Sequence, residues 1–294
     1  MPPEIIKLKS KYDVKTERVT NFYSANPFPG YKSIDNKSTI LKKGDKSLLS
    51  KKIKNLFKNK KKILEVGSGT CQLASYFAIG TNNQVFALDA TYRSLEEGRN
   101  FAEKNNINNI KFMHGNILDN NIKKDYFDLV WCNGVLHHTS DPYLGFVNSL
   151  SYLKKNGVII VGMYNYYGRF TTKIMQILFK IFGKKIVMML DPIVKEMKSD
   201  YNDKNAWIED QYNHPLEKTY TYKEISEWFK KNNVSLISTI PNSTKINLNE
   251  LDQKIISEAK NQEINKYQFL NEIMMIFNSF GKDGGLFVFI GIKK

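Results

Sequence analysis

Cysteine is scarce in this 294-residue chain, which has only two, Cys71 and Cys132. They lie far apart and form no CxxC pair or Cys/His cluster, so the sequence predicts neither a disulfide framework nor a zinc site. Long apolar runs are also missing: no stretch approaches the ~18 apolar residues of a membrane span, and the N-terminus lacks the apolar centre of a signal peptide. We therefore expect a cytoplasmic protein without a metal centre.

Arginine is the second shortage. Only four of the 44 basic residues are arginine, although the formal net charge is +15. The excess lies in residues 1–62, which hold 17 Lys/Arg against 5 Asp/Glu, whereas the rest of the chain holds 27 against 24. Proteins that read nucleic acids favour the bidentate guanidinium group of arginine. The pattern therefore favours a solvated lysine surface over a binding site for a polyanion.

From Lys62 onward the chain alternates short apolar runs with helical patterns, which is typical of βαβ units. The expected strands cover residues 63–66, 84–89, 109–115, 127–133, 157–164, 234–240 and 284–294. The expected helices between them cover residues 71–79, 94–104, 141–153 and 222–231. Seven strands with this spacing predict an α/β fold with a Rossmann-like, doubly wound seven-stranded sheet.

Three segments lie outside this pattern. Residues 1–61 form a basic and aromatic extension that we expect to act as a lid on one domain, residues 62–294. Helical cap insertions interrupt that domain after the fifth strand, at about 165–221, and before the seventh, at about 241–283. Insertions of this length in a compact α/β domain are usually lids or substrate covers.

The first insertion contains a strongly apolar stretch, residues 169–194, with five basic residues. Gly183 divides it, which predicts two short helices. The stretch fits either a cap over an apolar substrate pocket or an interfacial helix on an anionic membrane, and we favour the cap. Residues 207–221 then return polar groups, including His214 and Glu217, to the mouth of the sheet. In the second insertion, one apolar group fits either the core or the walls of a site: Met274, Met275, Phe277 and Phe280.

The sequence ILEVGSGTCQL, residues 63–73, runs from a strand through glycines into a helix. Gly67 and Gly69 allow a ligand to approach the backbone closely, and the helix N-terminus offers unpaired N–H groups. Asp89 closes the second strand 20 residues after Gly69, where a carboxylate can accept both hydroxyls of a ribose. This spacing fits the adenosine of either NAD or S-adenosylmethionine (SAM), although Gln72 stands where a dinucleotide fingerprint has its third glycine.

Glu65 favours SAM, because an acid inside an apolar strand needs hydrogen-bond donors. The motifs EVGSGTC, LDAT, HGNILD and FDLVWCNGVLHHTSDP closely resemble the class I SAM-dependent methyltransferases. The resemblance is nearest to the small-molecule branch that includes the ubiquinone and menaquinone methyltransferases. It covers residues 60–165 and departs from many members at Cys71, where they carry a third glycine.

This resemblance implies a SAM site built from strand ends. Glu65 would organise the loop near the methionine ammonium, Asp89 would hold the ribose, and Asn133 would meet the methionine end. Asn116 stands where the family often has an aspartate that faces the adenine amino group. The remaining implied contacts are Gly67, Ser68 and Gly69 beneath the methionine, Ala90 beside the adenine and Ile117 packed on its ring.

Candidate acceptor-side residues follow the fourth and fifth strands. His137 and His138 are the candidates for a general base, because they lie at the carboxyl end of the sheet, where doubly wound folds bind ligands. The sequence also suggests a set of substrate contacts from the segment NFYSANPFPGYKS, residues 21–33, and from the end of the fifth strand: Tyr23, Phe28, Tyr31, Tyr164 and Asn165.

The sequence thus predicts a SAM-dependent methyltransferase that acts on a small molecule, aromatic or lipophilic in character, at oxygen, nitrogen or carbon. Three alternatives stay open: a tRNA or rRNA methyltransferase that uses the basic N-terminal region, an NAD-dependent oxidoreductase, and a non-catalytic module that binds an adenosyl ligand. Nucleic acid is disfavoured because arginine is scarce and no NPPY motif follows the fourth strand. The oligomeric state stays open.

Overall fold

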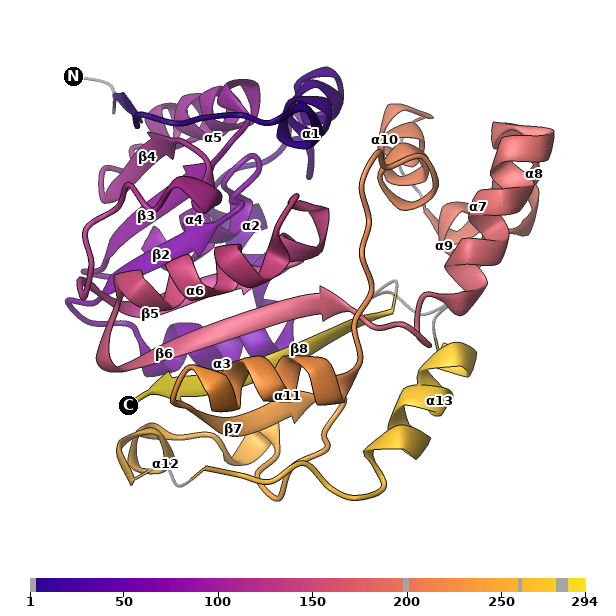
Figure 1. Ribbon diagram of the computed structural model, residues 1–294. Helices are drawn as coiled ribbons and strands as arrows, with labels where there is room; N and C mark the ends of the chain where they lie inside the picture. The colour runs from indigo at the N-terminus through magenta and orange to yellow at the C-terminus, as the bar shows by residue number, and fades with distance from the viewer. Residues whose placement is uncertain (1–3, 198–200, 259–260, 279–284) are drawn as a thin grey trace.

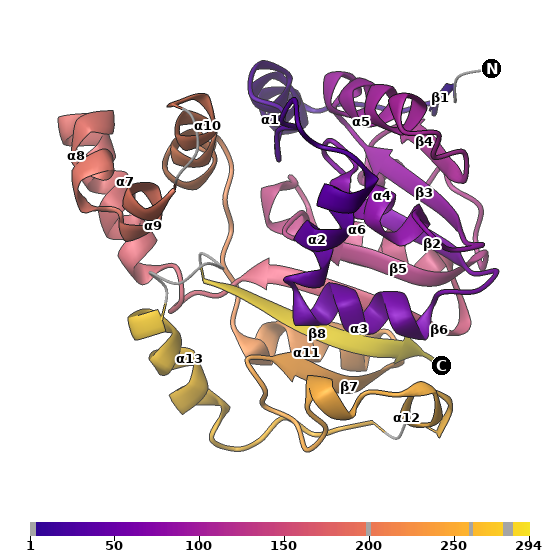
Figure 2. The same ribbon diagram turned by 180° about the vertical axis from the view of Figure 1, so that it is seen from behind.

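The computed structural model describes residues 4–197, 201–258, 261–278 and 285–294. Its centre is a sheet with the strand order β1-β4-β3-β2-β5-β6-β8-β7 (Figure 1, Figure 2). The first six strands pair in parallel, and β8 runs antiparallel to both β6 and β7. The strands are β1 (Ile5–Lys7), β2 (Lys62–Val66), β3 (Gln84–Asp89), β4 (Ile110–His114), β5 (Phe127–Asn133), β6 (Leu153–Tyr164), β7 (Val234–Ile240) and β8 (Leu286–Lys293).

The α/β fold and its seven expected strands are confirmed, and the bounds of β3, β5 and β7 agree with the sequence prediction. Among the described residues the strand count is corrected to eight. The additional strand, β1, lies in the N-terminal extension and pairs with β4, with Ile5 opposite Phe112. Three residues are too short a stretch for the alternation of buried and exposed side chains to give a signal.

Helices cover both faces of the sheet, because neighbouring strand residues such as Ile63 and Leu64 point to opposite faces and are both fully buried. One face packs against α2 (Lys37–Asp45), α3 (Leu48–Leu56), α4 (Gln72–Ala78) and α5 (Tyr92–Lys104). The other packs against α6 (Pro142–Tyr152) and α11 (Tyr222–Lys231). This arrangement leaves the carboxyl ends of the parallel strands free to build a site.

The first insertion forms a small helical lobe with its own core, which includes Met175, Val187 and Ile208. Its helices are α7 (Phe170–Phe182), α8 (Lys184–Leu190), α9 (Pro192–Glu196) and α10 (Tyr201–Tyr212). Gly183 separates α7 from α8 with φ of 72°, a conformation that glycine adopts without strain, so the predicted break is confirmed.

Three further α-helices lie outside these layers: α1 (Val14–Ala25) in the N-terminal extension, and α12 (Gln253–Glu258) and α13 (Gln268–Asn278) in the second insertion. On α13, Met275 is buried in the core, whereas Met274 and Phe277 are exposed. Phe280 lies outside the described residues. Within the described part of the chain, no helix combines the length and the apolar character that crossing a bilayer requires.

Gly98 allows α5 to pack closely against the turn that follows β2. A Cβ atom at this position would lie 2.7 Å from Sγ of Cys71 and 2.7 Å from the backbone oxygen of Thr70. We expect Gly98→Ala to lower the free energy of unfolding by about 1–2 kcal/mol, since overpacking costs about 1–3 kcal/mol and the gain in helix propensity is at most about 1 kcal/mol. Urea denaturation measures this change.

Gly30→Ala is the matched control, because a Cβ atom there would meet no heavy atom within 4 Å. It should cause no loss of stability. An unchanged or raised stability of Gly98→Ala would contradict the close packing of α5 on this turn.

Candidate functional site

A cavity of about 500 Å³ lies where the parallel strands β2, β3 and β5 end. Ligands bind at this edge in doubly wound sheets, and the size suits a small-molecule site. Residues of α1 and α10 complete the wall, and both ribbon views place these two helices near one another beyond the strand ends (Figure 1, Figure 2). The hydroxyl of Tyr23 on α1 joins them by donating to Oδ1 of Asp210 on α10 at 2.9 Å.

The glycine turn lies directly beneath the N-terminal segment. Gly67 and Gly69 have φ of 65° and 50°, and a Cβ atom at Gly69 would lie 2.3 Å from the backbone oxygen of Phe28. Thr70 secures the contact, because its N–H donates to that oxygen at 3.4 Å and its hydroxyl donates to the backbone oxygen of Pro29 at 2.5 Å. The segment around Phe28 and Pro29 therefore encloses the cavity above the turn.

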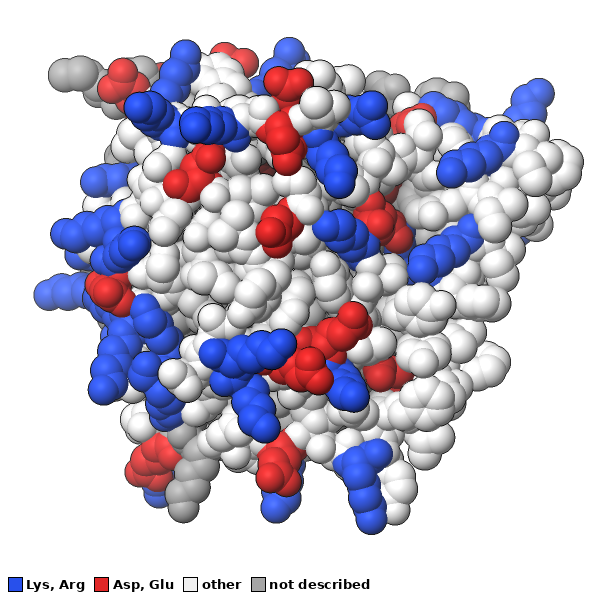
Figure 3. Space-filling model, in the orientation of Figure 1, with Lys and Arg blue, Asp and Glu red and all other residues white. Residues whose placement is uncertain are grey.

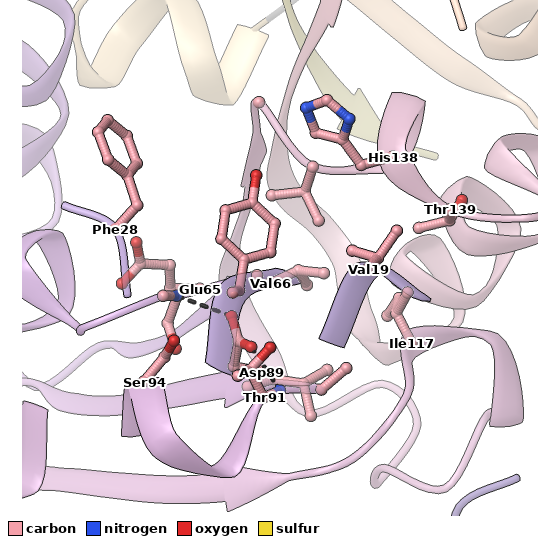
Figure 4. Close-up of a pocket in the computed structure, with 18 of the residues that line it drawn as sticks. Val19, Phe28, Glu65, Val66, Asp89, Thr91, Ser94, Ile117, His138 and Thr139 are labelled. Carbon is pink, nitrogen blue, oxygen red and sulfur yellow. Dashed lines mark hydrogen bonds between the residues drawn. The ribbon is translucent and has the colours of Figure 1, made fainter. Parts of the chain in front are cut away.

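Two carboxyl groups lie at the strand ends, one buried and one partly buried. Glu65 is 6% exposed, and its Oε2 has no hydrogen-bond partner among the described residues. Asp89 accepts from the backbone N–H of Gly69 at 2.8 Å and of Thr91 at 2.7 Å. Burial raises the pKa of Glu65 well above its usual range and that of Asp89 to about 6. In Figure 4 Asp89 and Ser94 lie at one end of the cavity and His138 at the other.

These groups fit SAM. The ligand carries an ammonium and ribose hydroxyls, and the cavity offers acceptors that lack donors, which include Oε2 of Glu65 and the buried Oδ1 of Asn133. The described wall residues include three acids, Glu65, Asp89 and Asp210, but no lysine or arginine. A cationic ligand is therefore favoured over a phosphorylated one.

The far end of the cavity is organised by Arg169, whose side chain is completely buried. Its Nε and Nη2 donate to the two carboxylate oxygens of Glu217 at 3.1 and 2.5 Å, and its Nη1 donates to Oε1 of Gln211 at 2.7 Å. The guanidinium also lies 3.9 Å from the ring centre of Tyr164. Tyr164 and Gln211 face the cavity, so this ion pair fixes part of the wall from behind.

His138 faces the cavity with a defined tautomer. Its Nδ1 lies 2.7 Å from the backbone oxygen of Leu216, which can only accept, so Nδ1 carries the hydrogen and Nε2 keeps a lone pair. Burial lowers its pKa to about 4, so the ring is neutral at pH 7. The ring of His214 lies 3.7 Å away and limits its movement.

All nine residues that the resemblance implies for the cofactor lie in the cavity wall: Glu65, Gly67, Ser68, Gly69, Asp89, Ala90, Asn116, Ile117 and Asn133. Asn116 has a further task, because its amide donates to the backbone oxygen of Lys11 and accepts from the N–H of Leu118, both at 3.0 Å. It therefore also ties the N-terminal arm to the sheet.

Three other predicted residues lie outside the described wall. His137 is fully buried with its ring stacked on Tyr164 at 3.9 Å, and burial lowers its pKa well below the usual range. Tyr31 stacks on Phe101 at 4.3 Å and donates to the backbone oxygen of Thr70. Asn165 donates to Glu272 and accepts from two N–H groups of its own turn. Their positions support the wall from behind and do not place them on a ligand.

The sequence did not single out the wall residues of the two helices: Thr16, Val19 and Thr20 on α1, and Trp207, Asp210 and Gln211 on α10. It indicated the segment 207–221 but named His214 and Glu217 there. Tyr23 and Asp210 are 187 residues apart and carry no sequence signal that their helices meet, so only the fold brings them together.

A family model described as a methyltransferase domain matches residues 57–233, more than half of the chain. The chain belongs to this methyltransferase family. It is an enzyme whose methyl donor is SAM, and the resemblance to the SAM-dependent methyltransferases that its motifs predict is confirmed. The matched region includes β2 to β6 and every strand-end residue of the site described above.

Solved structures share the fold of this methyltransferase. A putative methyltransferase from Haloferax volcanii, in a complex with the Trm112 methyltransferase activator, is 11% identical with a TM-score of 0.53 over 97% of this chain and 99% of that one. PKMT2 from Rickettsia typhi, in complex with AdoHcy, is 16% identical with a TM-score of 0.55 over 84% and 52%. A putative sarcosine dimethylglycine methyltransferase from Galdieria sulphuraria is 14% identical with a TM-score of 0.52 over 86% of each chain.

Asp89 offers a direct test of the cofactor end. Asp89→Ala should weaken S-adenosylhomocysteine binding at least about tenfold, since it removes an acceptor worth roughly 1.4 kcal/mol or more.

The wild-type affinity for S-adenosylhomocysteine should fall as the pH drops through about 6, because protonation of Asp89 removes its negative charge, and Asp89→Asn should reduce this dependence. Calorimetric titration measures both effects. Tight binding of NAD with no binding of adenosyl ligands would contradict this assignment.

Proposed function

We propose that this methyltransferase acts on a small molecule with a nucleophilic hydroxyl or amine, held between α1 and α10 at the far end of the cavity. The observation that carries the proposal is the enclosure of one continuous cavity by the glycine turn, the N-terminal segment and α10. A space of about 500 Å³ that also takes SAM leaves room for a small acceptor only.

Hydrogen-bond acceptors gather at this end. Tyr23 donates its hydroxyl hydrogen to Asp210, so its oxygen offers lone pairs to the cavity. Oδ2 of Asp210 accepts from the amide of Gln211 at 2.9 Å, and the lone pair on Nε2 of His138 completes the set. These groups favour a substrate that donates O–H or N–H, and Phe28, Trp207 and Tyr164 favour one with an apolar or aromatic body.

His138 is the proposed general base. Bound SAM supplies an activated methyl group, and the protein's tasks are then to align the acceptor, exclude water and accept its proton. Neutral His138 can accept that proton on Nε2, while the carbonyl of Leu216 stabilises the imidazolium through Nδ1–H. The N-terminal segment over the turn and α10 across from it exclude water from the cavity.

His138→Asn tests this role, because an asparagine amide can still donate to the carbonyl of Leu216 but cannot take the proton. Methyl transfer from labelled SAM to a panel of phenols and amines should fall about 100-fold or more in kcat, with S-adenosylhomocysteine affinity nearly unchanged. His214→Asn, outside the described cavity wall, should lose less than about tenfold. Equal losses in the two variants would contradict a base at His138.

Salt separates the small-molecule proposal from the nucleic-acid alternative. Transfer to a small acceptor should change little between low and moderate salt, whereas binding of a polyanion through several phosphates falls by roughly 10³ or more over the same range. Transfer to bulk tRNA or rRNA that shows this steep fall, with none to the panel, would overturn the proposal. SAM binding without transfer to either would overturn the proposal as well.

A further inference from the structure

Helix α7 presents an apolar stripe to solvent. Phe170, Ile174, Ile177 and Ile181 recur at helical spacing on one side, and Ile177 and Ile181 are 58% and 66% exposed. The opposite side of the helix holds Met175, which packs into the core of the lobe. The stripe is absent from the described cavity wall, so these residues do not cover a substrate there.

Helix α13 adds a second stripe at the same side of the molecule. Leu270, Met274 and Phe277 are exposed, with Phe277 at 72%. On the same helix, the ring of Phe269 contacts the ring of Tyr167, just before α7, with the ring centres 5.7 Å apart. Figure 1 and Figure 2 both place α7, α8 and α13 along one edge of the protein. We define the α7–α13 surface by these two stripes.

Lysines accompany the surface. Residues 170–197 contain five of them and two acids, Asp191 and Glu196, of which Asp191 is buried. At 3.6 residues per turn, Lys173 and Lys180 fall on one flank of the α7 stripe, where their long stems can extend their charges past the apolar side chains. Figure 3 shows the same margin as mostly white surface with Lys or Arg side chains in its upper part.

We propose that the α7–α13 surface docks on an anionic lipid bilayer and inserts its apolar stripes at the headgroup boundary. Large exposed apolar patches mark interaction sites, and an apolar helix face flanked by lysines is the pattern of an interfacial helix. The lysines beside the stripes favour an anionic bilayer over a second copy of the protein. Two copies that met through this face would bring their lysines together, and protein interfaces are depleted in lysine, whereas anionic headgroups neutralise it.

The sequence alone favours a substrate cap over a lipid-binding helix for residues 169–194, whereas the exposure of the stripe favours lipid binding. One side of the lobe supplies Trp207, Asp210 and Gln211 of α10 to the cavity, and the other carries the α7 stripe. Docking would therefore bring the cavity close to the bilayer, yet it requires no particular methyl acceptor and stands apart from the proposed function.

Cosedimentation of the full chain with phosphatidylcholine vesicles, with and without phosphatidylglycerol, tests the surface. The protein should bind the vesicles that contain phosphatidylglycerol, and rising salt should weaken binding. The double variant Ile177→Glu/Ile181→Glu should reduce binding at least about tenfold, because a buried isoleucine contributes roughly 1.5–3 kcal/mol. Lys173→Glu/Lys180→Glu should weaken it as well.

Ile34→Glu is the matched control, since Ile34 is 71% exposed and lies outside the α7–α13 surface. It should leave vesicle binding unchanged, and all variants should keep the wild-type affinity for S-adenosylhomocysteine, which shows that they are folded. Three results would overturn the proposal: no binding to either kind of vesicle, an equal loss with Ile34→Glu, or a dimer in light scattering that the Ile177→Glu/Ile181→Glu change dissociates.

Discussion

The buried guanidinium of Arg169 joins the parts of this protein that build the proposed acceptor end of its cavity. It connects the end of β6, where Tyr164 lies, to Gln211 on α10 and to Glu217 in the segment that leads back to the sheet. A charge buried this deeply is tolerated only when it is paired and hydrogen-bonded, and loss of one partner costs about 3–5 kcal/mol. The helical lobe therefore has one favoured position against the sheet, which brings Asp210 to Tyr23.

A second constraint acts at the strand ends, where buried Glu65 and partly buried Asp89 lie in a cavity wall without lysine or arginine among its described residues. Burial raises the pKa of both groups, because a negative charge away from water is costly in free energy. A cation with several donors relieves this cost. The backbone of Phe28 and Pro29 lies directly over Gly69 and Thr70 in the same region, so the N-terminal segment covers the glycine turn.

Much of the fold and of the strand-end wall of the cavity could be predicted from the sequence, because both depend on short-range patterns. Apolar runs such as 84–89 and 127–133 define strands, and Gly67, Gly69 and Asp89 follow strand ends at fixed spacing. The acceptor end could not, because it depends on packing between distant segments. Tyr31 and Phe28 look alike in sequence, yet only Phe28 reaches the cavity. Adjacent histidines behave in the same way: His138 faces the cavity, and His137 stacks behind Tyr164.

We propose that cofactor and acceptor share one cavity between the glycine turn and the Tyr23–Asp210 pair. A crystal structure of the protein with S-adenosylhomocysteine tests this arrangement. We expect the ribose on Asp89, the adenine beside Ala90 and Ile117, and the sulfur directed toward the space between Tyr23 and His138. A ligand bound elsewhere, or a sulfur directed away from that space with Tyr23 and Asp210 separated, would contradict it.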